Sequence, residues 1–403
     1  MRVTGRFPHA AGACGLMAAL VLAAGLVFCA ASSAADFSSV FGRSYLPDSR
    51  LNDSRTDGEA SGRRINLGTH HLFIRCQGDT GPVVIVDTAL GSVSLEWRHI
   101  QESLARRVSV CLYDRAGYGA SEPGPLPRTS ARIADELHIL LERAGIAGPY
   151  VLVGHSFGGY TVQRFAGRYP ASVAGVVLVD SSHPEQYERF LAAPIGLKTA
   201  PSNDRPGIRG FRFATPTLHP NLPAGVRDAV MHTLLRQPTR TAIAEEFYEF
   251  RRSAAEVREA GDLPDVPLLV LTRGRRVYPH TYRGDLMEGL WMRLQTELAA
   301  RAAHSAQIIA NYSGHYIHLD QPQLVVDAVS LVVDLARIQL SAARPSPAAF
   351  PAKPAWYAFE GAAWYSDGFH TRRVMGPAYP SQNGYRSPGW SADPQMLAWI
   401  GGD

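Results

Sequence analysis

The sequence contains few cysteines and no large excess of either positive or negative charge. Only four of its 403 residues are cysteines, and the formal net charge at pH 7 is +4. It contains no run of like charges and no basic stripe, so we expect no nucleic-acid partner. Beyond the N-terminus, no apolar run is long enough to cross a bilayer. The remaining composition, 46% hydrophobic and 19% charged, is that of an ordinary globular protein.

The N-terminus has the order of an export signal. Arg2 and Arg6 precede the apolar stretch Leu16 to Ala31, and small residues follow as far as Ala35. Charged, apolar and small-residue segments in that order are typical of a secretory signal peptide. We therefore expect residues 1–35 to be removed and the protein to be exported, either periplasmic or secreted, with no stable membrane span. A retained membrane anchor is the alternative.

Past a polar lead-in, residues 36–63, short apolar runs alternate with helical patterns. The expected strands are 64–67, 70–76, 83–86, 108–113, 150–153, 173–179, 266–271 and 308–312, and the expected helices include 97–105, 130–144 and 324–338. This alternation predicts an α/β fold, with a mostly parallel sheet and helices on both faces. The first two strands flank Gly68-Thr69 and predict an antiparallel edge. The core would comprise residues 64–182 and 263–338.

Two segments interrupt this pattern. Residues 183–262 show helical patterns at 224–236 and 241–260, and they are too long for a plain crossover. We expect them to form a helical cap inserted between two core strands and lying over the site; a surface excursion away from the chemistry is the alternative. Residues 341–403 are rich in proline, glycine and aromatics without periodicity, which predicts an irregular tail.

One stretch carries the strongest chemical signal. Gly154-His155-Ser156-Phe157-Gly158 follows an apolar strand and precedes apolar residues at helical spacing. A turn this tight leaves no room for side chains at the two flanking positions, which explains both glycines. Ser156 would be strained, with its hydroxyl presented above the sheet as a nucleophile.

Four motifs in order resemble those of the α/β-hydrolase superfamily, in its esterase-like branch. They are Asp87-Thr88-Ala89-Leu90-Gly91, the segment Tyr113 to Ser121, the stretch around Ser156, and Ser313 to Pro322. The resemblance covers about residues 64–336. It implies the α/β-hydrolase fold, with a catalytic order of serine, then acid, then histidine. It implies no metal and no organic cofactor.

The base and the acid follow from that order. His315, after the last strand and Gly314, matches the position of the base, and His318 is the competitor that the family assigns a structural role. Most relatives place the acid after the strand that ends at Leu271, where this chain has no carboxylate until Asp285. Some relatives place it one strand earlier, where Asp180 stands. We therefore expect Asp180 to be the acid, with Asp285 as the alternative.

The oxyanion would be held by two backbone amides. The first is the N–H of Phe157, directly after the nucleophile, and the resemblance assigns the second to Leu90 in the loop after Val86. Asp114 precedes the nucleophile in the chain, so we expect it to stabilise a turn and not to act in catalysis.

Two cysteines, Cys76 and Cys111, remain after removal of the signal, and both lie in expected strands. An exported chain meets an oxidising compartment, so a disulfide forms if these strands are neighbours. Two free buried thiols are the alternative.

These features predict an exported serine hydrolase, carboxylesterase-like, that cleaves esters or related small-molecule acyl compounds through an acyl-enzyme on Ser156. An aminopeptidase, a thioesterase or a carbon–carbon bond hydrolase would use the same triad. A non-catalytic binding protein with this fold is a further alternative. The substrate and the oligomeric state are not readable from the sequence.

Overall fold

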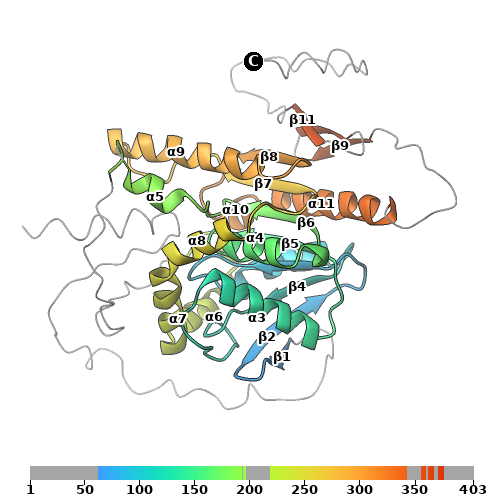
Figure 1. Ribbon diagram of the computed structural model, residues 1–403, viewed down its shortest axis with the longest axis vertical. Coiled ribbons are helices and arrows are strands. Elements are labelled where there is room, and N and C mark those ends of the chain that lie inside the picture. The colour runs from blue at the N-terminus through green and yellow to red at the C-terminus, as the bar shows by residue number, and fades with distance from the viewer. Residues whose placement is uncertain are drawn as a thin grey trace, which may run out of the picture.

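The computed structural model describes residues 62–192, 194–196 and 218–342, together with the backbone of 355–359, 362–366 and 371–375. The expected signal peptide, residues 1–35, and nearly all of the lead-in lie outside these residues. An eight-stranded sheet forms the centre (Figure 1), in the order β1-β2-β4-β3-β5-β6-β7-β8. Its strands are β1 (Arg63–Asn66), β2 (His71–Gln77), β3 (Val84–Asp87), β4 (Val110–Tyr113), β5 (Tyr150–His155), β6 (Val173–Val179), β7 (Leu268–Arg273) and β8 (Ser305–Ala310).

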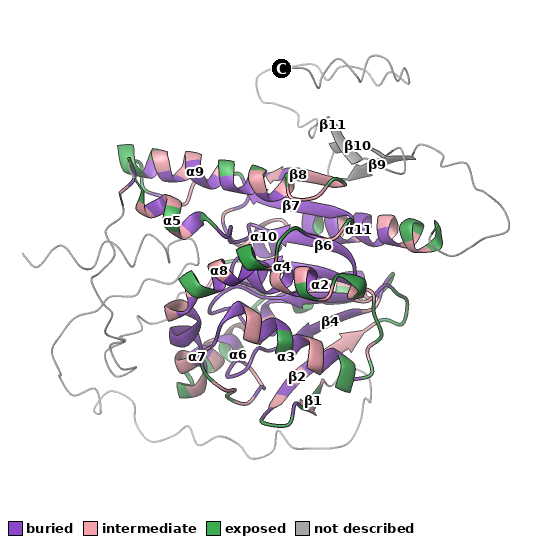
Figure 2. Cartoon of the chain, in the orientation of Figure 1, coloured by how far each residue is buried: buried purple, intermediate pink, exposed green. Residues whose placement is uncertain are grey.

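The sheet is parallel except at one edge. Strands β1, β2 and β4 pair antiparallel, and every pair from β4 to β8 is parallel. The predicted antiparallel edge and the mostly parallel sheet are therefore confirmed. In β3 to β7 every residue is buried, whereas β1 is largely exposed. Strands β6 and β7 are accordingly purple in Figure 2.

Helices cover both faces of the sheet. They are α2 (Arg98–Leu104), α3 (Ser130–Arg143), α4 (Gly158–Arg168), α9 (Tyr282–Ala299) and α11 (Pro322–Ala342). Val84 and Val86 face one hydrophobic cluster with α2 and α11, while Ile85 between them faces the cluster that contains α3 and α4. Alternate residues of a strand point to opposite faces, so an unbroken apolar run fills two cores.

Cys76 and Cys111 stand directly opposite each other where β2 pairs with β4. Their sulfurs form a disulfide, and the two Cα atoms are 4.0 Å apart. Of the two alternatives from the sequence, the structure therefore contains the bond. It joins the antiparallel edge to the parallel part of the sheet.

The segment between β6 and β7 contains α5 (Gln186–Leu191), α6 (Ala224–Leu235), α7 (Gln237–Tyr248) and α8 (Phe250–Glu259). The single helix expected over 241–260 is wrong, because it is two helices that meet at Glu249. Pro238 in the first turn of α7 starts that helix earlier than expected, as proline favours helix N-termini. Helices α5 and α9 are not among the elements expected from the sequence.

The expectation of an irregular tail is also wrong in part. Helix α11 continues to Ala342, and β9 (Ala355–Phe359), β10 (Ala362–Ser366) and β11 (Thr371–Met375) form an antiparallel three-stranded sheet. Phe359 pairs with Ala362, which leaves only Glu360-Gly361 between β9 and β10. A two-residue connection that contains glycine, between runs rich in aromatics, is a hairpin signal.

Candidate active site

Ser156 lies where β5 ends and α4 is about to begin. Its φ is +53°, in the left-handed region that side chains rarely adopt. A Cβ on Gly154 would lie 2.8 Å from the Gly158 carbonyl oxygen, and one on Gly158 would lie 2.3 Å from the Asp87 carbonyl oxygen. Only glycine fits at these two positions, which is the reason the sequence suggested for them.

The backbone of Ser156 is tied to the end of the neighbouring strand β6. Its N–H donates to the Val179 carbonyl at 3.2 Å, and its own carbonyl accepts from the Ser182 N–H at 2.9 Å. Asp180 stands between these two partners and has a φ of +39°. Among the described residues, Ser156 and Asp180 are the only residues other than glycine with positive φ. The two strained residues thus lie side by side at the carboxyl ends of β5 and β6.

Asp180 contacts the imidazole of His315. The distance from Asp180 Oδ2 to His315 Nδ1 is 2.6 Å, and both side chains are buried. The other carboxylate oxygen, Oδ1, accepts from Trp291 Nε1 at 2.8 Å and from the Arg273 N–H at 3.2 Å. Arg273 Nη1 lies 3.5 Å from Oδ2. Four donor groups from three residues therefore surround one carboxylate.

These contacts keep the Asp180 carboxylate charged. Its complete burial acts to raise the pKa, but the Arg273 guanidinium and the hydrogen bonds from His315 and Trp291 outweigh this and hold the pKa below its ordinary value. An ionised carboxylate can only accept hydrogen bonds, so Nδ1 of His315 is the donor in this contact.

The other ring nitrogen of His315 is available. Nε2 is buried and has no hydrogen-bond partner within the described part of the chain. The His315 carbonyl accepts from Nε2 of His155, the residue before Ser156, at 2.9 Å. Burial, with His315 nearby, lowers the pKa of His155 to about 3, so that ring stays neutral. The loop that carries His315 is thereby attached to the chain reversal that carries Ser156.

The alternatives from the sequence lie elsewhere. Asp285 is in the first turn of α9, where its exposed carboxylate pairs with Arg276 Nη1 at 2.5 Å. His318, in α10 (Ile317–Asp320), stacks on Trp97 with ring centroids 4.2 Å apart. Strand β7 runs on to Arg273, whose guanidinium is directed at Asp180.

The two expected oxyanion donors share one environment. The side chains of Leu90 and Phe157 belong to the same buried hydrophobic cluster. Within the described residues, neither backbone N–H donates to a protein acceptor. Gly158 lies against the carbonyls of Asp87 and Thr88, which sets the loop of Leu90 beside the start of α4.

The helical segment covers this region. Leu222, Val230, Ile243 and Phe250 pack in the same cluster as Leu90 and Phe157. Phe250 lies over the rings of Phe157 and Tyr160, with centroids 5.9 and 5.1 Å away. The segment with helices α6 to α8 therefore packs against Leu90 and Phe157, where the sequence predicted a cap.

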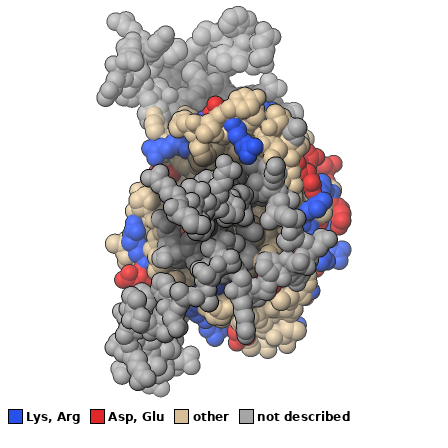
Figure 3. All heavy atoms as spheres, turned by 90° about the vertical axis from the view of Figure 1, so that its left-hand side faces the viewer, with Lys and Arg blue, Asp and Glu red and all other residues tan. Residues whose placement is uncertain are grey.

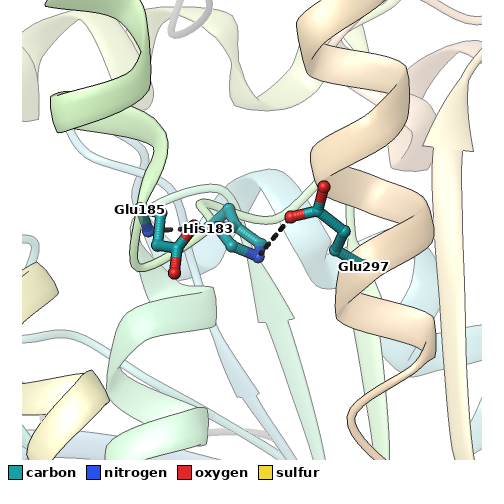
Figure 4. Close-up of side chains that lie close together, drawn as sticks. All are labelled: His183, Glu185 and Glu297. Atoms are coloured by element: carbon teal, nitrogen blue, oxygen red, sulfur yellow. Dashed lines mark hydrogen bonds and ion pairs between the residues drawn. The ribbon is translucent and has the colours of Figure 1, made fainter. Parts of the chain in front are cut away.

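A second group of side chains, a histidine and two glutamates, offers ligand atoms close enough together for a metal ion (Figure 4). His183 and Glu185, from the loop before α5, face Glu297 of α9. However, Arg189 contacts both carboxylates, and His183 Nδ1 already accepts from the Glu185 N–H at 3.0 Å. Arg189 therefore already balances one of the two negative charges that a cation would neutralise.

A groove of about 1010 Å³ contains none of the residues expected in catalysis. Its lining includes Arg64, Arg75, Arg98 and Arg236, from β1, β2, α2 and the residue after α6.

On the face shown in Figure 3, basic and acidic side chains of the described residues are interspersed. No helix in the described part of the chain is both long and apolar enough to span a membrane.

Parts of the sequence are similar to known proteins. The uncharacterized protein YqjL of Bacillus subtilis (strain 168) is 24% identical over 251 residues, which cover 62% of this chain and 82% of that protein. The probable transporter efuK of Hormonema carpetanum is 34% identical over 134 residues, 31% of this chain but only 19% of that much longer protein. The chain thus spans very different shares of the curated relatives that it matches.

Two solved structures share the fold. One, described as a "putative epoxide hydrolase" from Pseudomonas aeruginosa, has a TM-score of 0.53 at 17% identity and covers 69% of this chain and 96% of its own. The other, a "putative lipase" from Acinetobacter baumannii AYE, has a TM-score of 0.50 at 17% identity, with coverages of 70% and 93%. The family described as "Alpha/beta hydrolase family" matches residues 83–328. The chain therefore belongs to the alpha/beta hydrolase family of hydrolases.

Proposed function

We propose that this protein is an exported serine hydrolase that cleaves esters or related small-molecule acyl compounds. The observation that carries the proposal is the 2.6 Å contact between Asp180 and His315 Nδ1, with His315 Nε2 unpartnered among the described residues and strained Ser156 hydrogen-bonded to Val179 and Ser182, on either side of Asp180. A charged acid, an oriented imidazole and a serine at such a chain reversal are the parts of a nucleophilic triad.

The proposed reaction uses these residues in turn. His315 Nε2 takes the proton of the Ser156 hydroxyl as the oxygen attacks the acyl carbon. The amides of Phe157 and Leu90 donate to the resulting oxyanion, and His315 returns the proton to the leaving group. Water, deprotonated by the same nitrogen, then releases the acid and restores the Ser156 hydroxyl. Asp180 stabilises the imidazolium that forms twice in this cycle.

A fluorophosphonate probe tests the proposal. We expect it to label the wild-type protein and not Ser156→Ala, and the same substitution to abolish hydrolysis of p-nitrophenyl acyl esters. Esters, thioesters, amino-acid amides and carbon–carbon substrates assayed in parallel separate the enzyme classes that share this triad. A folded wild-type protein that is not labelled and hydrolyses none of these compounds would instead be a binding protein.

The export of the chain is a separate part of the proposal. It is supported by the order of the N-terminal residues and by the Cys76–Cys111 disulfide, since such bonds persist in oxidising compartments. Intact-mass analysis of the protein released from a bacterial host tests it. We expect a chain that begins at Asp36; full-length protein retained with the membrane fraction would refute the expectation.

A further inference from the structure

Arg115 is a buried charge that the triad does not use. It follows β4, is 2% exposed, and lies in the segment Tyr113 to Ser121. Its neighbour Asp114 holds the turn, accepting from the N–H groups of Ser94 and Ala120. That structural role is what the sequence suggested for Asp114. Arg115 instead points to the loop of the second oxyanion donor.

The guanidinium holds three successive residues of that loop. Nη1 donates to Asp87 Oδ1 at 2.5 Å and to the Thr88 carbonyl at 2.7 Å, and Nη2 donates to the Ala89 carbonyl at 2.9 Å. The flat fork of an arginine can bind several oxygens in fixed directions, which a lysine cannot. The loop is therefore held in one conformation by a single side chain.

The Ala89 carbonyl is the decisive contact. It belongs to the same planar peptide unit as the N–H of Leu90, and in a trans peptide these two groups point in opposite directions. An arginine bound to the oxygen therefore fixes the direction of the N–H on the other side. Donation to that oxygen also polarises the peptide and strengthens its N–H as a donor.

The opposite side of the guanidinium is held by the cap. Glu246 of α7 is fully buried, and its carboxylate accepts from Arg115 Nε at 2.8 Å and from Nη2 at 3.0 Å. Tyr118 also donates to Glu246, at 2.7 Å, and accepts from the Gly91 N–H at 3.3 Å. Burial works against the charge on Arg115, but Glu246 and Asp87 outweigh it and raise the pKa of the guanidinium.

We propose that Arg115 is a positioning residue that aims the Leu90 amide at the oxyanion, and that Glu246 makes this aim depend on a seated cap. The inference rests on the proposed serine hydrolase activity. With the cap displaced, Arg115 loses its counter-ion in the cap and the Ala89–Leu90 peptide is free to rotate. The oxyanion site is then complete only when α7 covers it.

Glu246→Gln is the test, because it keeps the shape of the side chain and removes its charge. We expect kcat for a p-nitrophenyl ester to fall about 10- to 100-fold with KM changed less than about threefold, as for the loss of part of one oxyanion donor. Arg115→Lys keeps the charge but loses the fork, and we expect a loss of about 100- to 1000-fold. In both variants, affinity for a trifluoromethyl ketone, whose adduct carries an oxyanion, should fall in step with kcat.

Glu256→Gln is the matched control. Glu256 is a buried cap glutamate that accepts from the Ser130 hydroxyl and the Ala131 N–H, and it does not touch the loop of Leu90. We expect it to lower the thermal midpoint while kcat and ketone affinity stay within about twofold of wild type. Wild-type kcat and ketone affinity in a folded Glu246→Gln, or equal losses in Glu256→Gln, would overturn the role of Arg115. An inactive, unlabelled wild type would instead refute the serine hydrolase itself.

Discussion

Replacing Asp180 by asparagine tests the triad because it should change which ring nitrogen of His315 carries the proton. The asparagine side chain offers one acceptor and one donor group where the carboxylate of Asp180 offers two acceptors. Trp291 and the Arg273 N–H both donate to Oδ1, so the amide oxygen must remain there. The NH₂ group then takes the place of Oδ2 and donates to His315 Nδ1. That interaction forces the imidazole proton onto Nε2, the nitrogen that has to accept the proton of Ser156.

The expected loss is large because the base is held in the wrong tautomer. Such a change costs about 10⁴-fold in kcat, or about 5.5 kcal/mol of transition-state stabilisation. The assay is steady-state hydrolysis of a p-nitrophenyl ester, with near-ultraviolet circular dichroism to verify the fold. Asp285→Asn is the control, and its exposed carboxylate should be dispensable within about twofold. A folded Asp180→Asn protein that retains a tenth of wild-type activity would refute this account of the triad.

Two other predictions concern the loops around the site. Burial raises the pKa of Glu96 to about 7 from 4.5, although hydrogen bonds from the Val93 N–H and Ser92 oppose it. The folded state thus keeps a proton that the unfolded chain has lost, so between about pH 4.5 and 7 this group lowers stability by about 3 kcal/mol as pH rises. Glu96→Gln should remove that part of the pH dependence of the unfolding free energy, measured by urea denaturation at several pH values. The same pH dependence in the two proteins would contradict the prediction. Gly158→Ala places a Cβ 2.3 Å from the Asp87 carbonyl oxygen. It should lower the rate of fluorophosphonate labelling at least about 100-fold. Labelling at the wild-type rate would show that the loop can move to accommodate the methyl group.

The sequence was most informative where the chemistry needs a local pattern. The glycines around Ser156 are required by the turn, and the expected strain is present in its φ of +53°. Chain order restricted the base to a late histidine, and the structure places His315 against Asp180. The resemblance to relatives with the acid one strand earlier favours Asp180, and Asp285 lies in α9, beyond the end of β7 at Arg273.

Contacts between distant segments could not be predicted in this way. Trp291 and Asp180 are 111 residues apart, and Glu246 and Arg115 are 131 apart. No pattern in a single sequence pairs such residues, since the pairing is set by how α7 and α9 pack on the core.

Helix α9 is a different case, because its signal was present. Its buried residues recur at helical spacing, at Met287, Leu290, Trp291, Leu294 and Leu298. A helix drawn from that spacing would have supplied the crossover between the last two parallel strands, as the right-handed crossover rule requires.

The bond between β2 and β4 has a consequence for how the protein can be made. It links two cysteines with a sequence separation of 35. The cross-link lowers the entropy of the unfolded chain and thereby stabilises the folded state by about 4 kcal/mol. Domains are stable by only about 5 to 15 kcal/mol, so this is a large share of the margin. Chains produced in a reducing cytosol, or stored with thiol reagents, would start without it. We expect low yield or aggregation under those conditions to result from the missing disulfide and not from poor packing of the core.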